Sequence, residues 1–163
     1  IYKCFNSNLL FHGCVPMEEN GEFSKVDILG RELKGKEYFD CLEKIVRKAY
    51  SEREQIEKSK DAIDLMWYLW CGPKSPLFGK NKAATFERYF VIEKETHNEI
   101  KNPYFTLIEN EEICDKILKE FGLEGKNSHI INGHIPVKEK DGESPIKANG
   151  KLLVIDRRIC KKL

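Results

Sequence analysis

The fold is decided by the stretch Ser128-His129-Ile130-Ile131-Asn132-Gly133-His134-Ile135-Pro136-Val137-Lys138. Its apolar run predicts a buried strand over 128–132, which stops at an Asn-Gly-His turn and continues as a short strand over 136–138. Open α/β sheets bind ligands beyond the carboxyl ends of their strands. His134 is therefore predicted to lie where such a fold places a ligand.

A second stretch repeats this order: Asn8-Leu9-Leu10-Phe11-His12-Gly13-Cys14-Val15-Pro16. It predicts a strand and turn over 8–16, with His12 at the end of the strand. Imidazole binds borderline divalent ions such as zinc, manganese, iron and cobalt. We therefore predict that His12 and His134 are ligands of one metal site. The pattern alone leaves open that each histidine only forms a hydrogen bond at its turn.

The two other histidines have different surroundings. His129 lies inside the predicted strand, so we expect it to pack there or to support a ligand indirectly. His97 lies in a charged segment and is expected to be solvated.

Composition excludes several classes of partner. The chain has 163 residues, a net charge of +1 and 40% hydrophobic residues, which is consistent with one domain that binds neither nucleic acid nor membrane. No apolar run approaches the roughly 20 residues that span a bilayer. Six scattered cysteines without a Cys-x-x-Cys pair favour reduced thiols and a cytoplasmic location. The chain has no initiator Met and opens just ahead of a core strand, so we expect a fragment of a longer protein.

Apolar spacing predicts alternating helices and strands, which favours a layered α/β arrangement. The segments are helices at 36–57, 60–70 and 109–121, a short helix at 84–90, strands at 90–94 and 151–156, and loops at 17–35, 72–83 and 139–150. The helical stretch 36–70 lies between strands and is predicted to be an insertion. Its aromatic residues Trp67, Tyr68 and Trp70 are predicted to form core or interface, because no basic residue is interleaved with them.

Two polar loops supply candidate phosphate-binding side chains. The loop after His134 contains Lys138, Ser144, Lys147 and Asn149. Lysine neutralises phosphate, while serine and asparagine supply oriented hydrogen bonds. Composition alone favours the alternative of an ordinary solvated loop.

The second basic loop is predicted to contribute Lys80 and Lys82, with Arg88 in the segment that follows. It lacks the Gly-x-x-x-x-Gly-Lys-Ser/Thr pattern, which excludes a P-loop. Arg88 could instead form only an ion pair with Glu87.

Several blocks of the sequence resemble class 3 fructose-1,6-bisphosphatase. They are Leu10–Pro16, Trp70–Lys80, Ala84–Phe90, Asn132–Lys138 and Gly142–Lys151. The resemblance extends over essentially the whole chain, up to about Asp156.

The resemblance implies a branch of the calcineurin-like metallophosphoesterases and an α/β (α+β) fold. The chain would be a single partial domain over 1–163, a partial β-sandwich flanked by helices, with the insertion at about 36–70. It implies a dinuclear manganese (Mn2+) centre and removal of the 1-phosphate of fructose 1,6-bisphosphate in gluconeogenesis. His12 and His134 would bind the same metal. No catalytic residue is assigned in this chain, and homo-oligomerisation is left open.

The sequence departs from the superfamily in three places. The motifs Asp-x-His, Gly-Asp-x-x-Asp-Arg-Gly and Gly-Asn-His-Asp/Glu are absent, Pro136 stands where many members have a last histidine, and Arg157–Leu163 differs from the family's continuation. We therefore expect a C-terminal portion that is inactive alone, exposes a sheet edge and has poor independent stability. Two alternatives remain: a non-catalytic binding module with structural histidines, and a phosphoprotein phosphatase of the same superfamily.

Overall fold

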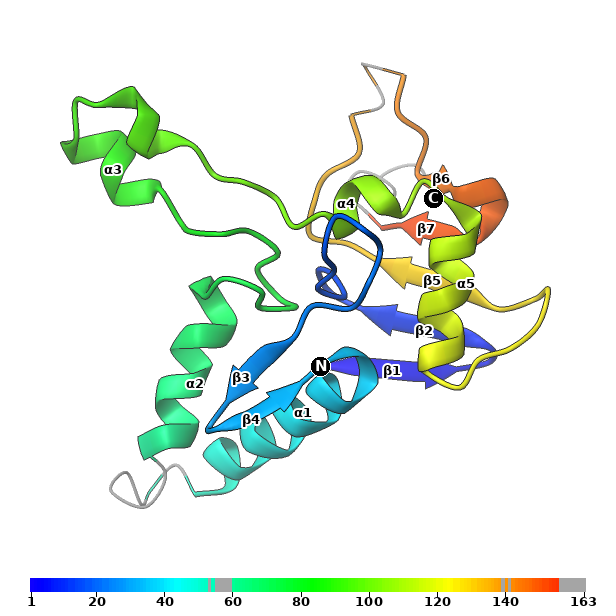
Figure 1. Ribbon diagram of the computed structural model, residues 1–163, viewed down its shortest axis with the longest axis horizontal. Coiled ribbons are helices and arrows are strands. Elements are labelled where there is room, and N and C mark those ends of the chain that lie inside the picture. Colours follow the sequence, from blue (N-terminus) through cyan, green and yellow to red (C-terminus); the bar gives the residue numbers. More distant parts are fainter. Residues whose placement is uncertain (53, 55–59, 139, 141, 156–163) are drawn as a thin grey trace.

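The computed structural model describes residues 1–52, 54, 60–138, 140 and 142–155 (Figure 1). The strands are β1 (Tyr2–Phe5), β2 (Asn8–Phe11), β3 (Val26–Ile28), β4 (Arg31–Leu33), β5 (His129–Asn132), β6 (Ile146–Lys147) and β7 (Leu152–Val154). The α-helices are α1 (Gly35–Ser51), α2 (Lys60–Cys71), α3 (Thr85–Phe90), α4 (Tyr104–Leu107) and α5 (Glu111–Glu120). Short 3-10 helices cover Lys94–His97 (η2) and Ala148–Gly150 (η4).

A five-stranded mixed sheet organises the described part of the chain, with the strand order β1-β2-β5-β7-β6. Strands β2, β5 and β7 are parallel neighbours, while β1 and β6 run antiparallel at the two edges (Figure 1). The carboxyl ends of β2 and β5 therefore lie side by side at the same end of the parallel strands. This arrangement confirms a mixed α/β fold.

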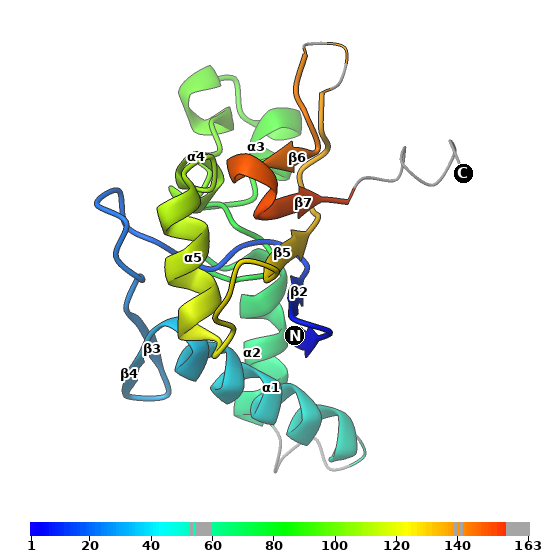
Figure 2. The same cartoon turned by 90° about the vertical axis from the view of Figure 1, so that its right-hand side faces the viewer.

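One face of the sheet is buried under helices. Alternate residues on each strand point to the same face, and Leu9, Ile130 and Leu152 are fully buried there. Helices α1 and α5 lie on this side of the sheet (Figure 2). Phe39 of α1 packs edge-to-face against Phe11 of β2, which ties the longest helix to the sheet.

The opposite face, which we call the open face, carries an apolar row across four strands. Leu10, Ile131, Leu153 and Ile146 are register partners from β2 to β6, and Ile155 extends the row beyond β7. Ile146 is 59% exposed and Ile155 48% exposed. The described residues therefore leave this face without a covering layer.

Most predicted elements are confirmed. Helix α2 matches the prediction at 60–70, α3 the one at 84–90, and α5 the one at 109–121. The Asn110 side chain caps the first turn of α5 by accepting a hydrogen bond from the Glu112 N–H. Helix α1 ends at Ser51, before the predicted end at 57; residues 53 and 55–59 lie outside the described part. Strand β7 ends at Val154, and residues 156–163 also lie outside it.

Four predictions are wrong. The segment 139–150 is not all loop, because it contains β6, which pairs with β7, and the 3-10 helix η4. The segment 17–35 is not all loop, because β3 and β4 form a hairpin around Leu29 and Gly30. Residues 90–94 form no strand, because the segment extends away from the sheet and has no neighbour to pair with (Figure 1). Residues 136–138 form no strand either, since Pro136 lacks the N–H that a ladder requires.

Strand β1, helix α4 and the 3-10 helix η2 have no counterpart among the predicted elements. Strand β1 pairs with β2 through a tight turn at Asn6 and Ser7, both with positive φ. Helix α4 is a single turn, too short for apolar spacing to reveal. None of the helices in the described ranges is both long and apolar enough to cross a bilayer.

Candidate metal centre

The two predicted histidines meet at the carboxyl edge of the sheet. His12 follows β2 directly, and His134 comes two residues after β5 ends. The Nε2 atom of His12 lies 3.0 Å from Nδ1 of His134. This contact has the length of a hydrogen bond, and it brings ring nitrogens from the ends of two neighbouring strands together.

The backbone holds this geometry from both sides. The N–H of Gly133 donates to the carbonyl of His12 at 3.0 Å, which joins the two turns. His134 has φ of 72°, a left-handed conformation that is uncommon for a residue with a side chain. The backbone at His134 is therefore strained in the conformation that places its ring beside His12. Such strain is common at functional sites.

The segment 72–79 buttresses the His12 turn. The N–H of Cys14 donates to the carbonyl of Pro76 at 2.9 Å. A Cβ atom at Gly13 would come within 2.5 Å of that same carbonyl oxygen, so only glycine fits. The Cys14 thiol is buried, which raises its pKa to about 12 and keeps it protonated.

The electrostatics around His134 favour its neutral form. Partial burial is the main cause that lowers the pKa of His134, and the charge of His12 adds to it. The backbone of Phe78 acts in the opposite direction through a hydrogen bond to the ring. Neutral imidazole is also the form of histidine that can bind a metal ion.

Two histidines form an incomplete donor set. Within residues 1–52, 54, 60–138, 140 and 142–155, no group of three or more His, Cys, Asp or Glu side chains is arranged to hold a metal ion. Metal sites normally use at least three protein ligands. The donor chemistry of the pair fits a divalent ion, but the pair alone would supply only part of a coordination shell.

Glu99 holds Lys80 of the second loop and Arg88 of the segment that follows it. Lys80 Nζ lies 2.8 Å from Oε2 of Glu99, and Arg88 lies 3.4 Å from the same oxygen. The N–H of Ala84 donates to the other oxygen at 2.9 Å. The bond from Lys80, then that from Ala84, lower the pKa of Glu99 to about 2. Sequence reasoning named Glu87 as the alternative partner of Arg88; the structure shows Glu99 instead.

These cations differ in their relation to the histidine pair. Lys80 is near enough to His134 for its charge to lower the pKa of that ring. Lys82 Nζ donates to the carbonyl of Thr96 at 2.6 Å, within the segment that carries α3. Lys82 nevertheless lines the same groove as His12 and His134. The structure therefore brings Lys80 and Lys82 to the surroundings of the pair, while Arg88 belongs to the neighbouring segment.

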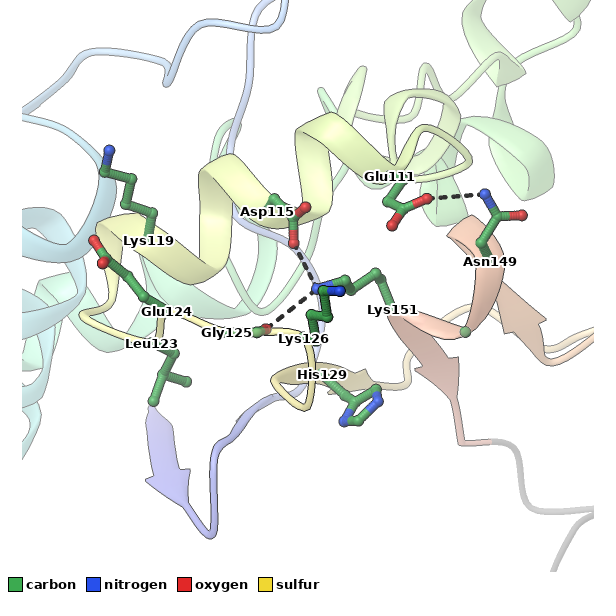
Figure 3. A pocket seen from close by; sticks show the side chains of 11 residues that line it. Glu111, Asp115, Lys119, Leu123, Glu124, Gly125, Lys126, His129, Asn149 and Lys151 are labelled. Atoms are coloured by element: carbon green, nitrogen blue, oxygen red, sulfur yellow. Dashed lines mark hydrogen bonds and ion pairs between the residues drawn. The ribbon is translucent and has the colours of Figure 1, made fainter.

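The four residues predicted in the last loop are divided between the two ends of the sheet. Lys138 is exposed and follows the His134 turn, and Ser144 Oγ accepts a hydrogen bond from the Ile146 N–H. Lys147 pairs with Glu109. Asn149 binds Glu111 at 2.9 Å, in a pocket shared with His129 at the amino end of the parallel strands (Figure 3). Asn149 is therefore at the edge away from His134, and substrate binding by all four remains a prediction.

Comparison with known proteins gives the family. The family model described as Firmicute fructose-1,6-bisphosphatase matches residues 1–163. The chain belongs to this family.

The curated relatives agree on the activity in their names. The chain is 59% identical over 156 residues to a class 3 fructose-1,6-bisphosphatase of Fusobacterium nucleatum subsp. nucleatum, covering 96% of this chain and 24% of the relative. It is 60% identical over 161 residues to one from Clostridium beijerinckii and 55% identical over 161 residues to one from Clostridium tetani, covering 99% of this chain and 24% of each. The chain thus spans about a quarter of these relatives. No solved structure matches.

In this fructose-1,6-bisphosphatase family member, the histidine pair opens onto two hollows. One, of about 580 Å³, lies against the open face and includes Leu10, Ile131 and Ile155. The other, of about 1090 Å³, is an apolar groove along α2 that includes Trp67 and Trp70. Both tryptophans are exposed, so they belong to the surface rather than to the core.

Proposed function

We propose that this chain supplies two histidine ligands to a dinuclear divalent-metal centre that removes the 1-phosphate of fructose 1,6-bisphosphate. Manganese (Mn2+) is the proposed metal, and gluconeogenesis in the cytoplasm is the proposed setting. The relatives' shared name supports the reaction. The 3.0 Å approach of His12 Nε2 and His134 Nδ1 is the observation that carries the metal assignment.

The surrounding residues support this role. The hydrogen bond between the Phe78 backbone and the His134 ring would orient that imidazole, as outer partners of metal-bound histidines do. When bound, two divalent cations supply an activated water and neutralise the phosphoryl oxygens. Lys80, near His134 and paired with Glu99, would add positive charge at the approach of an anionic substrate.

The open face supports the finer proposal of a metallophosphoesterase β-sandwich. In such a fold a second sheet would cover Leu10, Ile131 and Leu153, the central residues of the apolar row. The hollow beside the histidine pair would then receive the remaining metal ligands. We propose that other parts of a full-length polypeptide supply both, and that this chain alone is inactive because two histidines cannot hold two metal ions.

Manganese titration of the chain, followed by NMR, tests the metal assignment. Paramagnetic broadening should start at residues around His12 and His134 and should be lost in His12→Ala and in His134→Ala. His129→Ala is the matched control, because His129 lies at the opposite end of β5. Broadening that is centred elsewhere, or that survives both substitutions, would sink the assignment. Phosphate release by the isolated chain would contradict the proposed inactivity.

A second candidate function rests on the groove along α2. Exposed Trp67 and Trp70 lie with ring centroids 5.1 Å apart, a surface suited to a non-catalytic binding module. In that case the histidines would be structural, and manganese would produce no localised broadening. A phosphoprotein phosphatase has less support, since the relatives' names specify a sugar bisphosphatase.

A further inference from the structure

Asn132 is a buried polar residue on the apolar face of the sheet. Side chains alternate along β5, so Asn132 points to the same side as Ile130, and its register partner on β7 is the buried Val154. Its side chain is 3% exposed. A buried amide costs stability unless its polar atoms are hydrogen-bonded. The partners of this amide therefore indicate what the residue does there.

The amide nitrogen joins β5 to the turn that carries His12. Nδ2 of Asn132 donates to the carbonyl of Gly13 at 3.1 Å and to the Tyr104 hydroxyl at 2.8 Å. A carbonyl oxygen can only accept, so the contact with Gly13 fixes which end of the amide is the nitrogen. Asn132 thus holds the residue after His12, while it lies two positions before His134 in the chain.

This bond is the second of two that cross between the histidine turns. The N–H of Gly133 donates to the carbonyl of His12 at 3.0 Å. Neighbouring carbonyls of one turn are therefore held by neighbouring residues of the other. Two such bonds restrict rotation of one turn against the other, which a single bond would allow, and this is how a supporting shell keeps ligand side chains in place.

Tyr104 holds the amide from the other side. It lies on α4, is fully buried, and packs edge-to-face against Phe11 with ring centroids 6.0 Å apart. Phe11 is the residue before His12, so Tyr104 contacts both strands that lead to the histidine pair. A ring packed in the interior has little freedom to move. Its hydroxyl is therefore a fixed acceptor for the Asn132 amide.

We propose that Asn132 and Tyr104 are positioning residues that hold the turns of His12 and His134 side by side, as a shared metal ion requires. Tyr104 acts through Asn132, and Asn132 acts through the Gly13 carbonyl. The metal part of this inference rests on the proposed function. The geometric part, in which the amide keeps the two rings together, depends on no ligand.

NMR of the metal-free chain tests the geometric part. The two imidazole rings have centroids 4.9 Å apart, so the parent should show nuclear Overhauser contacts between their ring protons. Asn132→Ala should remove these contacts, and Tyr104→Phe should weaken them, because the amide then keeps only its bond to Gly13. Ser128→Ala is the matched control: Ser128 is also buried and polar, at 4% exposed, but it lies at the opposite end of β5. It should leave the contacts unchanged.

Manganese affinity, measured by calorimetry, tests the positioning role. Removal of outer partners of metal-bound histidines typically weakens metal binding by about 10–100-fold. Asn132→Ala should therefore weaken binding about tenfold, and Tyr104→Phe should weaken it less. The double variant should bind no more weakly than Asn132→Ala, because Tyr104 acts only through the amide. Independent losses would instead add, and circular dichroism shows whether each variant is folded.

Ring contacts that survive Asn132→Ala, or affinity losses that add in the double variant, would overturn the proposal. Lost ring contacts with unchanged manganese affinity would overturn the positioning role as well. Should Asn132→Ala fail to fold, Tyr104→Phe decides alone, since it must weaken both ring contacts and affinity while it stays folded.

Failure of the proposed function is distinguishable from failure of this inference. A parent chain that binds no manganese at the histidines would refute the metal centre, while the ring contacts of the metal-free variants would still decide the geometric part. Manganese binding that is equal in the parent, Asn132→Ala and Tyr104→Phe would refute the positioning role and leave the metal centre standing.

Discussion

Glu99 is the residue that joins three separate groups near the candidate metal centre. Its carboxylate binds Lys80, Arg88 and the N–H of Ala84. These bonds favour the charged form, which is why its pKa falls from 4.5 to about 2. A carboxyl group whose pKa is lower in the folded than in the unfolded chain stabilises the fold at pH values above its unfolded pKa. This stabilisation is lost as the pH falls through the folded pKa.

We predict that Glu99→Gln destabilises the chain by about 1.5–3 kcal/mol at pH 6, the range for hydrogen bonds to charged groups. The difference from the parent should shrink as pH falls from about 4.5 toward about 2, the interval over which the parent loses the charge. Urea unfolding at pH 6, 4 and 3 measures it. Glu87→Gln is the control, since Glu87 is a partly exposed glutamate on α3 for which the described part of the chain shows no ion pair. A difference that stays constant with pH would refute the linkage.

At the residue scale, the sequence could predict the histidine pair but not the glutamate. His12 and His134 each end an apolar run, and strand ends converge once the two strands are parallel neighbours. Glu99 lies 19 positions from Lys80, and their pairing depends on how the intervening segment folds back. No local sequence pattern predicts this folding back of the chain, so the sequence points to Lys80 and Arg88 but not to their partner Glu99.

At the element scale, the β3–β4 hairpin has an unusual turn residue. Leu29 and Gly30 have φ of 54° and 78°, the combination of a type I′ turn. Leu29 is exposed and gains little from its apolar side chain. A left-handed conformation is costly for most side chains, whereas asparagine adopts it readily.

Leu29→Asn should therefore stabilise the chain by about 0.5–1 kcal/mol. Thermal unfolding should show a higher midpoint than the parent. Leu29→Ala is the matched control, because it removes the same exposed side chain without a gain in left-handed preference. An unchanged or lower midpoint for Leu29→Asn would show that Leu29 has packing that compensates for its backbone.

The helices could be predicted from the sequence, whereas the β3–β4 hairpin could not, because only the helices have a regular spacing of apolar residues. Helix α1 buries Tyr38, Phe39 and Leu42, and α5 buries Ile117 and Leu118, so each repeats apolar residues at helical spacing. Strands β3 and β4 are three residues each, too short for alternation to be distinct. Leucine in place of asparagine at the turn removes the remaining local signal.

At the scale of the whole molecule, one face of the sheet is buried under helices and the other is exposed, and the sequence does not show which is which. Leu9 and Leu10 are adjacent and chemically identical, yet Leu9 is fully buried and Leu10 lies on the open face. Which face receives helices depends on the packing of α1 and α5 (Figure 2). The apolar row of the open face is then available for association.

We predict that the chain self-associates through this face and that Ile146→Lys combined with Ile155→Lys suppresses the association. Ile146 lies on the edge strand β6, and charge at an exposed sheet edge opposes pairing between copies. Light scattering across a concentration series, compared at equal helical content, measures the change. Ile92→Lys is the control: Ile92 is 92% exposed on the segment after α3, away from the sheet. If Ile92→Lys suppresses association and the paired substitution does not, the contact runs through that segment and the open face is not the cause.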